Sequence, residues 1–87
     1  MKVIKRDGRL QNFDLDKIKL SIARISEEDE RPMNSSDIEN ISKTINNYIL
    51  NNYPETINSY EIKDIIVNEM RNYGFGHLAN YYENNFI

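Results

Sequence analysis

Apolar residues recur every three or four positions along much of the chain, the spacing that places side chains on one face of an α-helix. The first such stretch follows Asp14, a residue type favoured at helix N-caps, and it ends near Ser26. Its apolar stripe consists of Leu15, Ile18, Ile22 and Ile25. The pattern therefore predicts an amphipathic helix over this segment.

A second helix is predicted from Ser35 or Ser36, because Ser36 and Glu39 have the spacing of a capping box. This helix must end before Pro54, since proline disfavours the helical conformation in the residue that precedes it. The apolar positions that would face a core are Ile38, Ile41, Ile45, Tyr48 and Ile49.

Two further helices are predicted in the last third of the chain. One begins at Asn58 or Ser59 and ends at Tyr73, with Gly74 as the residue that leaves the helix. A short helix is expected over 76–85. The sequence "GFGHLA" at the junction matches the glycine pattern of dinucleotide-binding folds, but that pattern requires a preceding strand. A corner between two helices is the favoured interpretation.

The remaining segments have β character. Two β-prone runs, at about 2–6 and 9–13, flank Asp7-Gly8, which is typical of a type I′ hairpin turn with positive φ at both residues. A third short strand is expected near 56–58 and would join the hairpin. The order of elements predicts an α+β fold in which a small three-stranded sheet lies on a bundle of four helices.

Composition narrows the chemistry of the chain. It has no Cys and one His, His77, which excludes disulfides, Cys-based zinc sites and His-rich metal sites. No apolar run approaches the roughly 20 residues of a membrane span, and the N-terminus lacks a signal-peptide pattern. The sequence has no Walker A loop, no Cys nucleophile and no G-x-S-x-G motif. We expect a single cytoplasmic domain over 1–87, without enzymatic activity of its own.

Charge is divided unevenly along the chain, whose net charge is −3. Residues 1–24 hold seven Lys or Arg against three Asp, whereas residues 25–87 hold four basic and eleven acidic residues. This division suggests that the N-terminal segment meets an anionic partner. A solvated basic face without a function would have the same composition.

Two predicted helix N-termini could complete an anion site beside the basic segment. A helix N-terminus offers unpaired N–H groups and a partial positive charge, and Lys17, Ser59 and Lys63 lie near the starts of two such helices. Apolar residues on the same elements could hold a flat base, namely Val3, Phe13, Ile18 and Ile62. The same residues could instead be an ordinary core with a basic rim.

The segment "VIKRDGRLQNFDLDKI" has the order V-x-K-R-D-G-x-x-x-x-F-D-x-x-K-I, which closely resembles the N-terminal signature of the ATP-cone domain. The segments "INSYEIKDIIVNEM" and "GHLANYY" resemble the family's later strand, its third helix and the Ala-x-x-Tyr of its last helix. The family comprises nucleotide-sensing domains of ribonucleotide reductases and of their transcriptional repressor. The chain looks most like the cone of anaerobic, class III reductases, and the resemblance implies a four-helix bundle capped by a three-stranded sheet.

The resemblance also implies a function and a set of site residues. The chain would be a regulatory domain that binds ATP or dATP, with or without Mg²⁺, and acts within or on a ribonucleotide reductase. By resemblance, the adenine pocket would be formed by Val3, Phe13, Ile18 and Ile62, with the Gln11 backbone and Asp14 at the base edge. Phosphates or ribose would be held by Lys5, Arg6, Lys17, Ser59 and Lys63, since Lys and Arg neutralise phosphate.

One departure from the family pattern leaves alternatives open. Family members commonly carry a basic residue at the end of the last helix, where this chain has "ENNFI". A cone that serves as a protein-interaction module without nucleotide is therefore one alternative. Nucleic-acid binding through the basic hairpin is another, disfavoured by the acidic remainder. The expected partners are an adenine nucleotide, a reductase domain or subunit, and a second copy through Tyr73, Phe75, Tyr81 and Phe86; no membrane is expected.

Overall fold

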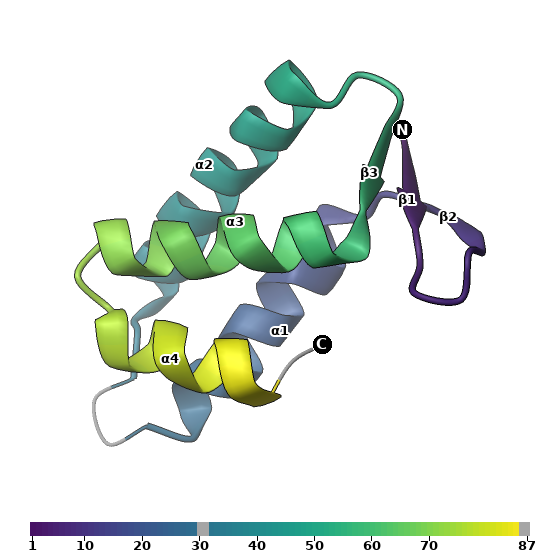
Figure 1. Cartoon of the computed structure of the whole chain (residues 1–87). Helices are drawn as coiled ribbons and strands as arrows, with labels where there is room; N and C mark the ends of the chain where they lie inside the picture. Colours follow the sequence, from purple (N-terminus) through teal and green to yellow (C-terminus); the bar gives the residue numbers. More distant parts are fainter. Residues whose placement is uncertain (30–31, 86–87) are drawn as a thin grey trace.

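The computed structural model describes residues 1–29 and 32–85. A three-stranded sheet lies at one end of four helices, and α1 and α3 both begin at that end (Figure 1). The elements follow the order β1 (Lys2–Ile4), β2 (Leu10–Asn12), α1 (Leu15–Glu27), α2 (Ser35–Asn52), β3 (Thr56–Asn58), α3 (Ser59–Asn72) and α4 (Gly76–Asn85). The predicted α+β fold is confirmed.

Strand β1 is the centre of the sheet. It pairs antiparallel with β2, where Val3 lies opposite Gln11, and parallel with β3, where Val3 lies opposite Ile57. Directly opposed residues project from the same face of a sheet, and Val3 and Ile57 are buried in the core. This register therefore places Gln11 on the face that meets the helices. Both hairpin strands are shorter than the predicted runs 2–6 and 9–13. Arg6 belongs to the turn between them, and Phe13 lies between β2 and the Asp14 cap of α1.

The turn between β1 and β2 differs from the predicted type I′ turn. Every described residue with positive φ is a glycine, and in this turn it is Gly8, at 87°. The Gly8 N–H donates to the Lys5 carbonyl at 2.9 Å, and the Lys5 N–H donates to the Arg9 carbonyl at 2.8 Å. The loop thus has three residues and needs only one left-handed position. Asp7 avoids that costly conformation and accepts from the Arg9 N–H at 3.1 Å through its carboxylate.

Helix α2 starts within the predicted window, but different residues cap it. The Asn34 side chain accepts from the Asp37 N–H at 2.8 Å, and the Asp37 carboxylate accepts from the Asn34 N–H at 3.3 Å. The predicted box of Ser36 and Glu39 is wrong. Because the helix begins at Ser35, the N-cap falls on Asn34, and Ser36 lies inside the first turn.

A single cluster of buried apolar side chains joins the sheet to all four helices. Its largest fully buried side chains are Ile22, Ile25, Ile41, Ile45, Ile49, Ile57, Ile66 and Met70. Tyr48 was expected in the buried stripe of α2, yet it is 47% exposed. The four-residue spacing of Ile41, Ile45 and Ile49 already fills that stripe and leaves Tyr48 at its edge. Within the described ranges, no helix is long and apolar enough to cross a membrane.

The corner between α3 and α4 is built as predicted. Gly74 has a φ of 87°, and its N–H donates to the Arg71 carbonyl at 3.0 Å. The next N–H, that of Phe75, donates to the Met70 carbonyl at 2.8 Å. These two bonds satisfy carbonyls that a helix end otherwise leaves unpaired.

The conformation of Gly74 predicts the effect of adding a methyl group there. Gly74→Ala should lower the free energy of unfolding by about 1–2 kcal/mol, because a left-handed residue with a Cβ is strained. Gly76→Ala is a matched control: an added Cβ has no neighbour within 4 Å at either glycine, and only Gly74 has positive φ. Urea unfolding of both variants checks this. A Gly76→Ala loss as large as that of Gly74→Ala would contradict the explanation.

Candidate functional site

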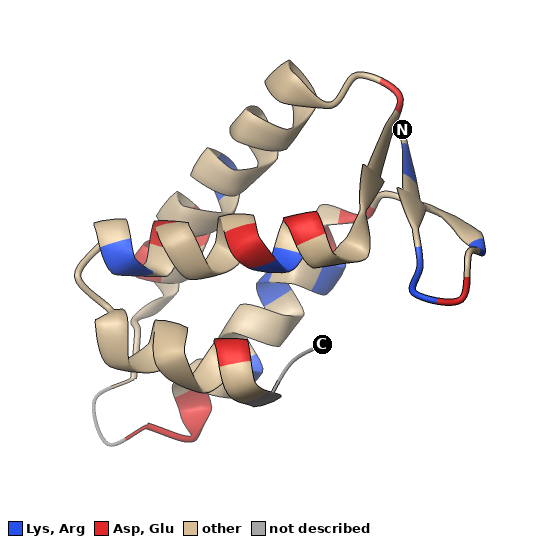
Figure 2. Cartoon of the chain, in the orientation of Figure 1, with Lys and Arg blue, Asp and Glu red and all other residues tan. Residues whose placement is uncertain are grey.

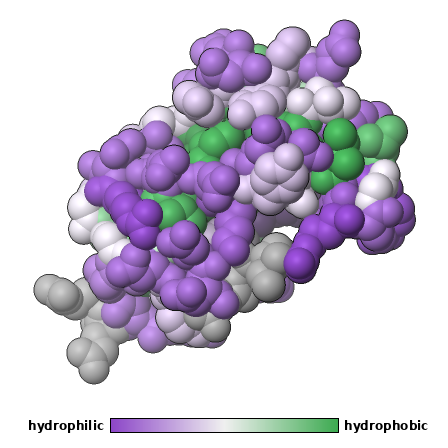
Figure 3. All heavy atoms as spheres, viewed as in Figure 1, coloured by the Kyte–Doolittle hydropathy of each residue, from purple (hydrophilic) through white to green (hydrophobic). Residues whose placement is uncertain are grey.

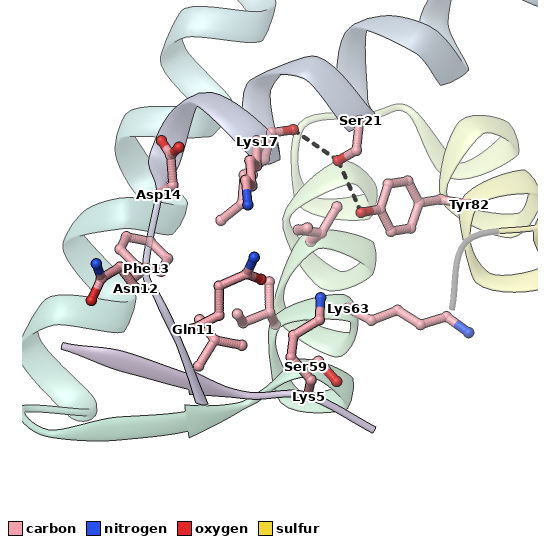
Figure 4. Close-up of a pocket in the computed structure, with 14 residues that line it drawn as sticks. Lys5, Gln11, Asn12, Phe13, Asp14, Lys17, Ser21, Ser59, Lys63 and Tyr82 are labelled. Atoms are coloured by element: carbon pink, nitrogen blue, oxygen red, sulfur yellow. Dashed lines mark hydrogen bonds between the residues drawn. The ribbon is translucent and has the colours of Figure 1, made fainter. Parts of the chain in front are cut away.

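A cavity of about 190 Å³ opens between the sheet and the first turns of α1 and α3. It is lined by Val3, Lys5, Gln11, Asn12, Phe13, Asp14, Lys17, Ile18, Ser21, Ser59, Ile62, Lys63, Ile66 and Tyr82. Ten of the eleven site residues predicted from the sequence are among them, and Arg6 is the exception. The ends of the Gln11 and Lys17 side chains face each other across this space (Figure 4).

Apolar side chains form part of the cavity wall. Val3 and Ile18 are buried, while Phe13 and Ile62 are half-buried and pack against the same core. The pairing of β1 with β2 places the amide side chain of Gln11 beside Val3. An apolar wall with a few polar groups at its edge is the usual character of a small-molecule site.

Two helix N-termini lie at the cavity. Asp14 caps α1, where its Oδ1 accepts from the Asp16 N–H at 3.0 Å, and Oδ2 offers a second acceptor. Ser59 is the first residue of α3, and Lys63 lies about one turn further along. Lys17 lies in the first turn of α1. Each helix therefore brings an ammonium group close to the positive end of its dipole.

The lysines at the cavity are not neutralised by neighbouring carboxylates. Over residues 1–29 and 32–85, no ion pair involves Lys5, Lys17 or Lys63. By contrast, the Lys19 ammonium lies 2.8 Å from the Glu39 carboxylate, and this hydrogen bond raises the pKa of Lys19 and lowers that of Glu39. An anion entering the cavity would not have to displace a carboxylate from the three ammonium groups.

Arg6 lies beside the cavity rather than in it. It belongs to an adjoining hollow of about 240 Å³ that is lined by Lys5, Arg6, Asp7, Arg9 and Ser59. Lys5 and Ser59 border both spaces, so they form a shared rim. Figure 2 shows basic residues on the hairpin and the first half of α1, and acidic residues at the far end of α1. The same view shows acidic residues on the hairpin turn and along α3, so the basic residues do not form a face free of acidic ones.

Four lining residues were not assigned to the site from the sequence: Asn12, Ser21, Ile66 and Tyr82. Ser21 lies three residues after Ile18 on α1, and this helical spacing could have indicated it. Tyr82 is the tyrosine of the Ala-x-x-Tyr match, but nothing in the sequence connects it with Ser21, 61 residues away. The packing of α4 on α1 brings the two hydroxyl oxygens to 3.1 Å (Figure 4).

Polar side chains also link α4 to the end of α1, away from the cavity. His77 Nε2 bonds to the Asp29 carboxylate, and the Tyr81 hydroxyl donates to the Glu28 carboxylate. The partner of His77 was not evident in the sequence because 48 residues separate the pair. In the part of the chain that the structure describes, no group of three or more His, Cys, Asp or Glu could hold a metal ion.

Comparison with known proteins identifies the family. The model of the ATP cone domain matches residues 1–83 of the chain. The chain belongs to the ATP-cone family. Similar relatives include the transcriptional repressor NrdR of Streptococcus uberis and that of Streptococcus pyogenes serotype M5, each 31% identical over 68 residues, or 78% of this chain. The match covers 40% of each relative, so the ATP cone spans less than half of these curated proteins.

The family assignment confirms the resemblance seen in the N-terminal signature. An ATP cone is a nucleotide-sensing regulatory domain, and the cavity is bordered by ten of the residues that the resemblance selects. Their roles toward a nucleotide are developed below as a proposal.

The aromatic surface expected to support self-association is less open than predicted. Tyr73 and Tyr81 are 40% and 42% exposed, but their hydroxyls bond to Thr44 and Glu28. Phe75 is half-buried, and Phe86 lies outside the described residues. Figure 3 shows the apolar surface of this view as separate areas among hydrophilic side chains. Self-association remains a prediction.

Proposed function

We propose that this ATP cone binds an adenine nucleotide, ATP or dATP, in the cavity between the sheet and helices α1 and α3. One observation carries the proposal. Lys5, Lys17 and Lys63 border the same cavity as the apolar wall, at the N-termini of α1 and α3. The domain would have no catalytic role and would regulate a ribonucleotide reductase. Membership in the ATP-cone family supports this regulatory role, as do relatives that are transcriptional repressors.

The adenine ring would lie against the apolar side of the cavity, beside Phe13 and Ile18. Asp14 would accept a hydrogen bond from the exocyclic amino group through Oδ2, because Oδ1 already accepts from the first turn of α1. The Gln11 backbone would form a hydrogen bond with the same edge of the base. Guanine carries a carbonyl oxygen at the position of the adenine amino group, and the Asp14 carboxylate would repel that oxygen.

The phosphates would lie toward the rim and partly outside the cavity. Enclosed ligand pockets usually measure about 300–1,000 Å³, so a cavity of 190 Å³ accommodates only part of a nucleotide. The chain of phosphates would pass Lys17 and Lys63, cross the rim at Lys5 and Ser59, and approach Arg6 in the adjoining hollow. Mg²⁺ usually keeps several waters and binds through phosphate oxygens, so it would enter with the nucleotide.

This function predicts base-selective stabilisation. ATP and dATP should raise the melting temperature, because a ligand that binds only the folded state stabilises it by about 2.7 kcal/mol at a hundredfold excess over Kd. GTP and tripolyphosphate should raise it less, since neither satisfies Asp14. Thermal unfolding with each compound at fixed ionic strength is the measurement. Equal shifts in melting temperature with all four compounds would show that the cavity is a general anion site without selectivity for the base.

A protein-interaction module without nucleotide is the second candidate. The observation in its favour is that the described end of α4 carries Glu83, which pairs with Arg71 at 3.2 Å, where the family commonly has a basic residue. The same thermal experiment separates the two functions. A melting temperature unchanged by ATP and dATP at millimolar concentration would favour this second candidate.

A further inference from the structure

Strand β2 forms one edge of the sheet, and no strand in the described part of the chain pairs with its outer side. The Lys5 N–H donates to the Arg9 carbonyl, so the backbone of Arg9 is directed toward β1. Inward and outward backbone groups alternate along an antiparallel strand. The N–H and C=O groups of Leu10 and Asn12 therefore project away from β1, where they can pair with an additional strand.

The face of the sheet that points away from the helices offers an apolar contact beside this edge. Gln11 lies on the face toward the helices, so its neighbour Leu10 lies on the opposite face. Leu10 is 64% exposed and lies directly opposite Ile4, which is half-buried. Figure 3 shows hydrophobic surface at the sheet end of the molecule. A strand added beside β2 would cover the Leu10 side chain with a side chain of its own.

The charge of the hairpin indicates which kind of strand fits this edge. Residues 1–13 hold four Lys or Arg against one Asp, and Figure 2 shows basic residues on both arms of the hairpin. Only Lys5 among these four borders the nucleotide cavity, and the other three, Lys2, Arg6 and Arg9, are exposed. A second copy of the chain would bring an equally basic hairpin to the edge, and the two hairpins would repel each other. An acidic segment is the complementary partner.

We propose that the outer edge of β2 binds an extended segment of a partner protein in which apolar residues alternate with Asp or Glu. The segment would add a fourth strand to the sheet through hydrogen bonds to the backbone of Leu10 and Asn12. Its apolar side chains would lie beside Leu10, and its carboxylates would be attracted by the basic side chains of the hairpin. This interaction goes beyond nucleotide binding and requires no nucleotide in the cavity.

A short synthetic peptide of alternating Glu and Val, with blocked ends, is the probe for this edge. It is titrated into the domain without nucleotide, and amide hydrogen exchange is followed by NMR. At saturation, exchange of the Leu10 and Asn12 amides should slow at least about fivefold, because both N–H groups gain a partner. Exchange of the Gln11 amide should slow less, since strand pairing already directs its N–H toward β1.

Two control peptides separate charge from backbone pairing. A peptide of alternating Lys and Val keeps the apolar pattern and reverses the charge. A Glu-Val peptide that is N-methylated at each Val loses the N–H groups that would face β2 when Val lies opposite Leu10. Each control should bind at least about tenfold more weakly than the Glu-Val peptide. Equal affinity of either control would overturn the proposal.

Variants of the domain test the apolar contact. Leu10→Thr keeps a residue that favours strands and removes much of the apolar surface, so it should weaken binding of the Glu-Val peptide about three- to tenfold. Leu20→Ala is the matched control, because Leu20 is 50% exposed on α1, and it should change the affinity less than about twofold. Melting temperatures without peptide establish that both variants are folded.

Four further results would overturn the proposal. The first is a Glu-Val peptide that does not bind at millimolar concentration, and the second is protection that appears away from Leu10 and Asn12. The third is a dimer in which these amides are already protected without peptide, since a second copy would then occupy the edge. The fourth is tighter binding of a single-stranded oligonucleotide, which would assign the basic hairpin to nucleic acid.

Discussion

Replacing one cavity lysine with alanine should weaken ATP binding about 10- to 100-fold, whichever of Lys5, Lys17 and Lys63 is changed. The three lie after β1, in α1 and in α3, and they come together only at the cavity. A charge-assisted hydrogen bond to a partly desolvated phosphate contributes roughly 1.5–3 kcal/mol, which corresponds to this loss of affinity. Calorimetric titration at fixed salt measures it.

Three other lysines serve as matched controls: Lys2, Lys19 and Lys43. Lys2 donates to the side chain of Asn12, Lys19 pairs with Glu39, and none of the three borders the cavity. Each control changed to alanine should weaken ATP binding less than about threefold, the size of a screened long-range charge effect. Similar small losses of ATP affinity at all six positions would mean that the basic residues attract the nucleotide only through long-range electrostatics. The assigned phosphate site would then be wrong.

Ile45→Ala should lower the free energy of unfolding by about 2–5 kcal/mol, the usual loss for a fully buried isoleucine. Ile45 is 0% exposed and lies in the middle of α2, where it belongs to the cluster that joins all four helices. A domain of this size is stable by roughly 0.05–0.15 kcal/mol per residue. The void left by Ile45→Ala would therefore remove a large part of the free energy of unfolding. Urea unfolding measures this loss.

Leu50→Ala on the same helix is the control for Ile45→Ala. Leu50 is 50% exposed, so its truncation should cost under about 1 kcal/mol. Ile45→Val, which removes a single methylene group, should cost about 0.5–1.5 kcal/mol. Equal losses at positions 45 and 50 would show that α2 does not pack as described.

Signals between neighbouring residues predicted most of the fold. The isoleucine spacing of α1 and α2 and the glycine at the end of α3 predicted helices that the structure confirms. The errors were also local. The hairpin turn uses three residues because only Gly8 takes the left-handed conformation, and Asn34 replaces Ser36 as the cap because the helix begins at Ser35. In both cases several local hydrogen-bond arrangements fit the same letters, and propensity alone does not select among them.

The sequence by itself determined the chemistry that the site can offer. Its ordered N-terminal pattern and the later segment "INSYEIKDIIVNEM" indicated the family and together selected ten of the residues that border one cavity. Which cations stay unpaired was decided only by the tertiary structure, since Lys19 meets Glu39 across two helices while Lys17 faces the cavity. The Ser21–Tyr82 pair was likewise decided there. Its partners are 61 residues apart, and only the packing of α4 on α1 brings their hydroxyl oxygens to 3.1 Å.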